Sequence, residues 1–219
     1  MSARRPSRLV VLVSGGGSNL QAFIDACGHP DYPCRITGVI SNRPQAGGLG
    51  RAARAGLPAT VVDHTRFASR EDFESALAAA IDDFGADIVI LAGFMRILTE
   101  GFVRRYRGRL LNIHPSLLPK YPGLHTHQRA IEAGEAEAGA SVHFVTEELD
   151  GGPVILQARV PVLPGDDAGS LAARVLGQEH RIYPLAVRLL AEGRLRLQGG
   201  SALLEGVGIP PSGIPDAGH

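Results

Sequence analysis

The stretch LVVLVSGGGSNL, residues 9–20, decides the fold class. Residues 9–13 are an apolar, largely β-branched run that predicts a buried strand, and residues 20–27 have the spacing of an amphipathic helix. The glycines between them predict a tight turn. Glycine amides and a helix N-terminus can hold an anion, and Ser18 or Asn19 could cap the helix and bond phosphate oxygens. The turn is therefore a candidate phosphate cradle.

Two familiar nucleotide motifs do not fit this turn. No Gly-Lys-Ser/Thr follows it, as a P-loop requires, and Leu20 stands where the dinucleotide fingerprint has its third glycine. The second expected strand is followed by Ser41-Asn42-Arg43-Pro44, without the acidic residue that binds an NAD ribose. A glycine turn without a ligand remains an alternative at this point.

Strands and helices alternate outward from this stretch. Strands are expected at 35–40, 60–63, 87–93, 110–114, 139–146 and 154–160, and helices at 47–55, 69–84, 99–107, 124–133 and 166–190. This order predicts an α/β fold with a doubly wound, mostly parallel twisted sheet. The strands at 139–146 and 154–160 should pair antiparallel, and 194–205 should form a last hairpin, giving an antiparallel C-terminal extension.

One domain is expected over residues 1–206. Its first half, 1–108, would bind phosphate, and its second half, 109–206, would hold the catalytic residues. The Gly/Pro-rich tail at 207–219 is expected to be weakly ordered.

Composition excludes several function classes. Lys plus Arg equals Asp plus Glu at 22 each in 219 residues, so no excess positive charge favours nucleic acid. Cys27 and Cys34 have neither zinc-finger nor disulfide-framework spacing. The apolar run at 9–13 is too short for a signal peptide or a membrane span. A cytoplasmic, reduced protein without a nucleic-acid or membrane partner is expected.

A second stretch, LLNIHPSLLPKYPG at residues 110–123, predicts a strand that delivers polar side chains. Asn112 and His114 are two apart, so they face the same side, and Pro115 ends the strand. In open α/β sheets, ligands bind at the carboxyl ends of strands. The alternative, in which the two side chains only satisfy loop backbone, remains open from these residues alone.

The remaining polar residues give weaker signals. His125 and His127 are two apart, which suits no common zinc motif, so no metal site is predicted. No Gly-x-Ser-x-Gly motif of a serine hydrolase is present. Asp150, in the turn EELDGGP at 147–153, reads by itself as an ordinary turn aspartate.

Four separated segments together carry a resemblance to a known family. They are SGGGSNLQ at 14–21, LAGFMRIL at 91–98, the 110–127 stretch ending in LHTH, and SVHFVT through LDGGP at 141–153. In this order and spacing, the chain resembles the phosphoribosylglycinamide formyltransferases, folate-dependent enzymes of purine synthesis with a Rossmann-like formyltransferase fold.

The resemblance implies a role for particular residues. The catalytic trio would be Asn112, His114 and Asp150. The substrate would be held by Gly17, Ser18 and Asn19 at its phosphate and by Glu179 near its ribose. The folate would be bound by Arg70, Met95, Arg96, Ile97, Leu98, Thr146, Glu147, Glu148 and Leu149. It also implies a cis peptide before Pro119 and a mobile loop after it. Gly16 is a departure, since some relatives have a larger polar residue there, but a cradle of backbone amides does not need that side chain.

The chemistry implied is direct transfer of the formyl group of 10-formyltetrahydrofolate, as co-substrate, to the amine of phosphoribosylglycinamide. Asn112 and a charged His114 would donate to the oxyanion, and Asp150 would keep the imidazole charged and accept a proton. The partners would be small molecules, acting on a monomer or homodimer. No role is predicted for Lys120 or His143.

Three alternatives share part of this pattern. The methionyl-tRNA formyltransferases share the Asn-x-His-Pro-Ser-Leu-Leu-Pro segment, but the phosphate cradle, the zero net charge and the short region after the core argue against them. A hydrolase releasing formate would not need the cradle. A non-catalytic phosphate-binding module would explain the glycine turn alone.

Overall fold

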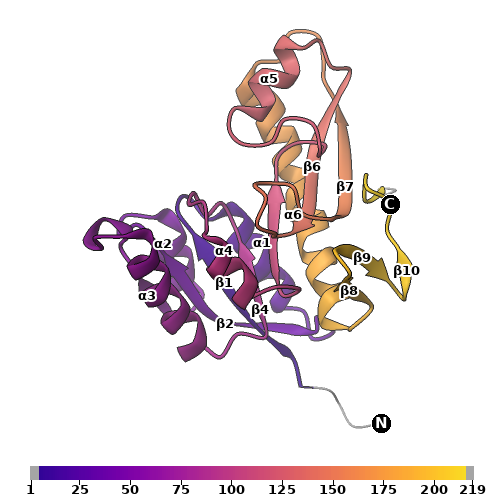
Figure 1. Cartoon of the computed structure of the whole chain (residues 1–219). Coiled ribbons are helices and arrows are strands. Elements are labelled where there is room, and N and C mark those ends of the chain that lie inside the picture. The colour runs from indigo at the N-terminus through magenta and orange to yellow at the C-terminus, as the bar shows by residue number, and fades with distance from the viewer. Residues whose placement is uncertain (1–4, 216–219) are drawn as a thin grey trace.

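The computed structural model of the chain describes residues 5–215 (Figure 1). The strands of the large sheet are β1 (Ser7–Val13), β2 (Cys34–Ser41), β3 (Ala59–Val61), β4 (Ile88–Leu91), β5 (Leu110–His114), β6 (Glu137–Phe144), β7 (Val154–Pro161) and β11 (Ile214–Pro215). The helices are α1 (Ser18–Cys27), α2 (Gly47–Arg54), a 3-10 turn η1 (His64–Arg66), α3 (Arg70–Asp83), α4 (Glu100–Arg105), α5 (Thr126–Glu132) and α6 (Ala168–Ala191).

The large sheet has the order β11-β7-β6-β5-β4-β1-β2-β3. Neighbouring strands from β3 to β5 run parallel, whereas β6 runs antiparallel to both β5 and β7. Chain order reverses at β1, which lies between β2 and β4. The crevice at such a switch point is where open α/β sheets bind ligands.

Each face of this sheet packs on its own hydrophobic cluster. One cluster joins alternate residues of the strands to α1, α5 and α6, and includes Phe23, Leu111 and Tyr183. The other joins the opposite residues to α3 and α4, through Phe73 and Phe102. Helices on both faces bury the strands on two sides, which explains why their sequences read as continuous apolar runs. In Figure 1, α6 runs behind β6 and β7.

The C-terminal part forms a small separate sheet. Its antiparallel strands are β8 (Leu195–Gln198), β9 (Ser201–Leu204) and β10 (Val207–Gly208), in the order β10-β9-β8. The chain then returns to the large sheet, where β11 pairs with β7. Residues 216–219, the end of the predicted tail, lie outside the described residues.

The predicted fold class is confirmed: the large sheet is mostly parallel and doubly wound, and the C-terminal extension is antiparallel. The predicted pair of strands on either side of Asp150 is β6 and β7. The predicted hairpin at 194–205 is β8 and β9. Ser69 caps α3 with its hydroxyl, and Asp167 caps α6 within a capping box. Both side chains are short and carry an oxygen that accepts from a free backbone N–H in the first turn of the helix.

Candidate functional site

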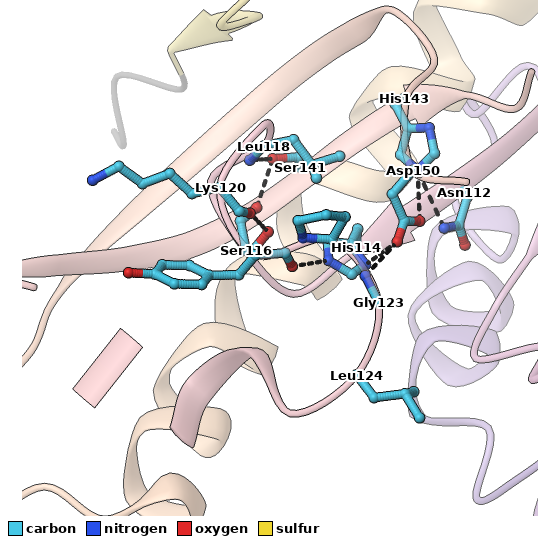
Figure 2. A network of polar contacts seen from close by, with 12 residues as sticks. Asn112, His114, Ser116, Leu118, Lys120, Gly123, Leu124, Ser141, His143 and Asp150 are labelled. Atoms are coloured by element: carbon cyan, nitrogen blue, oxygen red, sulfur yellow. Dashed lines mark hydrogen bonds and ion pairs between the residues drawn. The ribbon is translucent and has the colours of Figure 1, made fainter. Parts of the chain in front are cut away.

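The side chains of Asn112, His114 and Asp150 lie together on one face of the sheet (Figure 2). The first two alternate along β5 with Leu111 and Ile113, which are buried in the cluster under α6. Asp150 comes from the loop between β6 and β7, and its Oδ2 lies 3.4 Å from His114 Nδ1. Both side chains of this pair are less than a tenth exposed. Residues 36 positions apart in the chain therefore form one buried polar cluster.

The surroundings of His114 determine which of its ring atoms carry hydrogen. Nε2 lies 2.8 Å from the carbonyl oxygen of Tyr121, which can only accept, so Nε2 carries a proton. Nδ1 faces the Asp150 carboxylate, which is also an acceptor. Both ring nitrogens of His114 therefore face an acceptor of the protein, the shorter contact being that of Nε2.

Asp150 is held in an unusual backbone conformation. Its φ is 52°, in the left-handed region that aspartate tolerates better than most residues, and Gly123 donates its backbone N–H to Oδ2 at 2.9 Å. Gly152, just after it, passes so close to the carbonyl of Phe144 that a Cβ there would lie 1.8 Å from the oxygen. The glycines of this turn therefore allow it to fold back onto the sheet and aim the carboxylate at His114.

Asn112 has a buried partner that the sequence analysis left without a role. His143 lies directly opposite Asn112 in the antiparallel register of β5 and β6, and Asn112 Nδ2 is 3.2 Å from His143 Nε2. Two-residue alternation at Ser141 and His143 was visible in the sequence. Only the register of the two strands shows that these residues face Asn112 and His114.

The segment after His114 is fastened by two side chains of the neighbouring strands. Ser141 Oγ donates to the carbonyl of Ser116 at 2.6 Å and accepts from the N–H of Leu118 at 3.0 Å. Gln157 donates to the carbonyl of Leu118 at 2.7 Å. The peptide before Pro119 is cis, as the resemblance implied. The expected mobility of the following loop stays a prediction.

The glycine turn after β1 reaches the same edge of the sheet. Its residue Gly17 has φ 72° and is the N-cap of α1, without a side-chain cap. The expectation that Ser18 or Asn19 caps this helix is therefore wrong. A Cβ at Gly17 would lie 2.7 Å from the Cα of Gly48, the second residue of α2, so the turn packs directly on that helix. Arg51 supports it from α2, donating its Nε–H to the carbonyl of Gly16 at 2.8 Å.

Asn19 instead uses its side chain to reach α6. Its Nδ2 donates to Glu179 Oε2 at 2.7 Å, and both residues are buried. Burial raises the pKa of Glu179, which the hydrogen bond from Asn19 only partly offsets. Among the described residues, nothing bonds the buried Asn19 Oδ1. Two of the predicted substrate residues are thus in contact although 160 positions separate them.

The predicted folate residues lie on two loops and at one helix end. Met95, Ile97 and Leu149 are large apolar side chains that are 55–59% exposed. Arg96 and Leu98 lie beside them in the loop after β4, and Thr146, Glu147 and Glu148 lie in the loop after β6. Arg70 is exposed at the start of α3.

An open cavity of about 420 Å³ borders the turn of Asp150 and is lined by Pro119 and Thr146, among others.

The loop after β4 contacts the glycine turn through a hydrogen bond. The hydroxyl oxygen of Ser14 accepts from the backbone N–H of Met95 at 2.7 Å. The hydroxyl of Tyr183 on α6 donates toward the carbonyls of Leu91 and Leu111, which joins α6 to the two strands β4 and β5.

Comparison with known proteins identifies the family. A model of the formyl transferase family matches residues 7–187. The phosphoribosylglycinamide formyltransferase of Escherichia coli is 55% identical over 94% of this chain and 97% of its own. The chain belongs to the phosphoribosylglycinamide formyltransferase family.

Other family members give the same result. A solved phosphoribosylglycinamide formyltransferase from Coxiella burnetii has a TM-score of 0.92 at 48% identity, covering 96% of this chain and 99% of that one. The human trifunctional purine biosynthetic protein adenosine-3 is 46% identical over 89% of this chain, which matches 19% of its length. The chain is thus an enzyme of a formyltransferase family in purine biosynthesis.

The described residues contain neither a metal-binding cluster nor a membrane-spanning helix. Residues 5–215 contain no group of three His, Cys, Asp or Glu side chains arranged to hold a metal ion. Within the same residues, none of the helices has the length and apolarity needed to cross a membrane.

Proposed function

We propose that this chain transfers the formyl group of 10-formyltetrahydrofolate to the amine of 5-phosphoribosylglycinamide, giving formyl-phosphoribosylglycinamide and tetrahydrofolate. The observation that carries the proposal is the cluster of Asn112, His114 and Asp150, with a glycine turn at the same edge of the sheet, in a chain of this family. The cluster offers donors for an oxyanion beside an acceptor for a proton, which acyl transfer to an amine requires.

The first step is attack of the amine nitrogen on the formyl carbon. A carbon–nitrogen bond forms, the carbonyl electron pair moves to oxygen, and the tetrahedral intermediate carries an oxyanion and a cationic nitrogen. Asn112 Nδ2 and the Nδ1–H of His114 are the donors for this oxyanion, because the His114 Nε2–H is held by the carbonyl of Tyr121. His114 is buried and Asn112 half-buried, and away from water hydrogen bonds to developing charge are stronger.

The second step moves a proton and breaks a bond. Asp150 accepts the proton of the cationic nitrogen, directly or through a water molecule, and the proton is returned to N10 of the folate as the carbon–N10 bond breaks. The oxyanion electron pair restores the carbonyl of the new formamide. Protons and electrons balance without a covalent enzyme intermediate, and no metal is used.

The flanking residues supply binding. The amides at Gly17, Ser18 and Asn19, at the start of α1, suit the substrate phosphate. Glu179 and the free Asn19 Oδ1 suit ribose hydroxyls.

The folate is assigned to the two loops beside Asp150. The exposed apolar side chains of Met95, Ile97 and Leu149 suit its ring system, with the neighbouring residues of their loops, Arg96, Leu98, Thr146, Glu147 and Glu148, completing the site. Arg70 suits its acidic tail. We also propose that the enzyme acts in the cytoplasm, as a monomer or homodimer, on small molecules alone.

The test is to incubate the chain with 10-formyltetrahydrofolate, with and without phosphoribosylglycinamide, and to follow tetrahydrofolate. We expect tetrahydrofolate to appear only when the amine substrate is present, in equal amount to the formylated product. Release of formate without the amine would indicate a hydrolase, and transfer to methionyl-tRNA would indicate the other formyltransferase. Either result would overturn the proposal, as would a lack of turnover.

A further inference from the structure

We propose that His143 is a positioning residue, which engages one Nδ2–H of Asn112 and so aims the other at the oxyanion of the transition state. The inference rests on the proposed function, in which Asn112 is an oxyanion donor. His143 itself would touch neither substrate and would act only through the carboxamide.

Nδ1 of His143 faces a backbone acceptor. This nitrogen lies 2.9 Å from the backbone carbonyl oxygen of Phe144, the next residue, and a carbonyl can only accept. Nδ1 therefore carries the hydrogen in the neutral ring. Because that hydrogen bond is made to the adjacent peptide of β6, the strand itself fixes both the ring orientation and the tautomer.

The other ring nitrogen of His143, Nε2, is an acceptor. Burial lowers the pKa of His143, and it outweighs the Phe144 carbonyl and the carboxylate of Asp150, which act in the opposite direction. The ring is therefore neutral at neutral pH, and Nε2 is an acceptor. It lies 3.2 Å from Asn112 Nδ2, at the distance of a hydrogen bond from the amide.

The contact with Nε2 of His143 fixes the orientation of the Asn112 carboxamide. A carboxamide has a donor end and an acceptor end of similar shape, and only the donor end is useful beside an oxyanion. An Nε2 lone pair accepts from Nδ2 and would repel Oδ1, so it selects one of the two orientations. The second Nδ2–H then remains for the substrate.

The surroundings of His143 are consistent with this single role. Its side chain is 3% exposed, and it is paired across the sheet with Asn112. Asp150 Oδ1 lies 3.8 Å from Nε2, too far for a good hydrogen bond, and the carboxylate has its closer contacts with His114 and Gly123. The imidazole of His143 therefore interacts mainly with Asn112, and Asp150 remains available to the substrate. Figure 2 shows Asp150 and Asn112 approaching His143 from the site.

The experiment is a double-mutant cycle on the full chain. Phe replaces His143 to keep a ring and remove the acceptor, and Ala replaces Asn112, alone and together. Turnover is measured per active site, with active sites counted by tetrahydrofolate binding, so that misfolded protein does not enter the kcat. His29→Phe, at an exposed histidine of the α1–β2 loop, is the matched control and should leave turnover unchanged.

We expect His143→Phe to lower kcat about tenfold, below the loss of about 10²–10³ for removing an oxyanion donor outright, with both KM values little changed. In the Asn112→Ala background, the same change should alter kcat by less than about twofold, within the scatter of additive effects. An unchanged kcat in His143→Phe, or a further loss above twofold in the double variant, would overturn the inference.

A conservative variant separates positioning from simple packing. His143→Gln places a carbonyl oxygen near the position of Nε2, so it retains an acceptor for Asn112. It should recover most of the turnover lost in His143→Phe, whereas a packing role predicts no recovery from the less similar shape. If Asn112→Ala alone were fully active, the proposed function of Asn112 would fail instead.

Discussion

The glycine turn and the polar cluster of Asn112, His114 and Asp150 lie at one edge of the sheet but are built in opposite ways. The proposed cradle in the turn consists of the backbone amides of Gly17, Ser18 and Asn19, and its geometry depends on φ 72° at Gly17. The cluster uses side chains from β5, β6 and the loop after β6. The turn is held by contacts with α2, and the cluster by strand register and a buried polar network. We therefore expect substitutions in the turn to weaken substrate binding and substitutions in the cluster to lower turnover.

The largest effect should come from the charge of the cluster. Asp150→Asn keeps the shape that accepts from Gly123 but removes the carboxylate facing His114. We expect kcat to fall by about three orders of magnitude, since a general base contributes about 10²–10⁴. The kcat of His114→Ala should fall by a comparable factor. Substrate binding, measured by calorimetry, should change far less.

The control for the charge is Asp83→Asn, at an exposed carboxylate at the end of α3. It should have the kcat of the unmodified enzyme. Full activity in Asp150→Asn would remove this residue from the mechanism and leave the cluster without a proton acceptor.

The next effect should come from the backbone of the turn. Gly17→Ala adds a Cβ that meets the Cα of Gly48 at 2.7 Å and must adopt a left-handed φ. We expect the KM for phosphoribosylglycinamide to rise by about two orders of magnitude, as several charge-assisted bonds to phosphate are lost. The KM for the folate should change little, as initial-rate kinetics would show.

Gly15→Ala is the matched control for the turn, because a Cβ at Gly15 has no neighbour within 4 Å and its φ is not positive. It should leave the KM for the amine substrate within about threefold of the original. Equal losses in the two variants would mean that the cradle does not depend on the conformation of Gly17.

A smaller effect should come from the network that fastens the segment after His114. Gln157→Met removes the donor to the carbonyl of Leu118 at similar side-chain volume. We expect the free energy of unfolding to fall by about 1–3 kcal/mol, the cost of leaving a buried acceptor unpaired, with a several-fold loss of kcat. Denaturant unfolding and initial rates measure the two.

Gln128→Met is the control, since the Gln128 side chain bonds Glu132 on the exposed side of α5. Its stability should change by less than about 0.5 kcal/mol. If Gln157→Met were as mild, the position of the cluster would not depend on the contact between Gln157 and Leu118.

The smallest effect should be a pH dependence of stability that arises from Glu179, which contacts Asn19 from α6. The pKa of buried Glu179 is raised above its usual 4.5, so its protonated form stabilises the fold in acid, and that contribution is lost as pH rises through the raised pKa. Gln stays neutral, so the melting temperature of Glu179→Gln relative to the original should increase from about pH 4 to about pH 7.

Glu132→Gln, at a residue on the exposed side of α5, should show no such trend and serves as the control. A constant difference in melting temperature between Glu179→Gln and the original across this range would contradict the raised pKa of Glu179.

The sequence predicted most of the fold because each signal is local. Apolar runs of strand length, caps such as Ser69 and Asp167, and glycines after helices all act within a few residues. The same holds for the glycine turn as a motif, although its cap was assigned to the wrong residues. Gly17 is the cap because it adopts the left-handed conformation, which leaves the side chain of Asn19 free to reach α6.

What the sequence by itself determined is the order of strands and helices, the glycine turn, and the common facing of Asn112 and His114, since chain geometry within one element requires only sequence spacing. Only the tertiary structure decided which residues meet them. The antiparallel register places His143 opposite Asn112, the folded-back turn brings Asp150 to His114, and α6 brings Glu179 to Asn19. These contacts depend on packing between distant segments, which no local pattern of residues encodes.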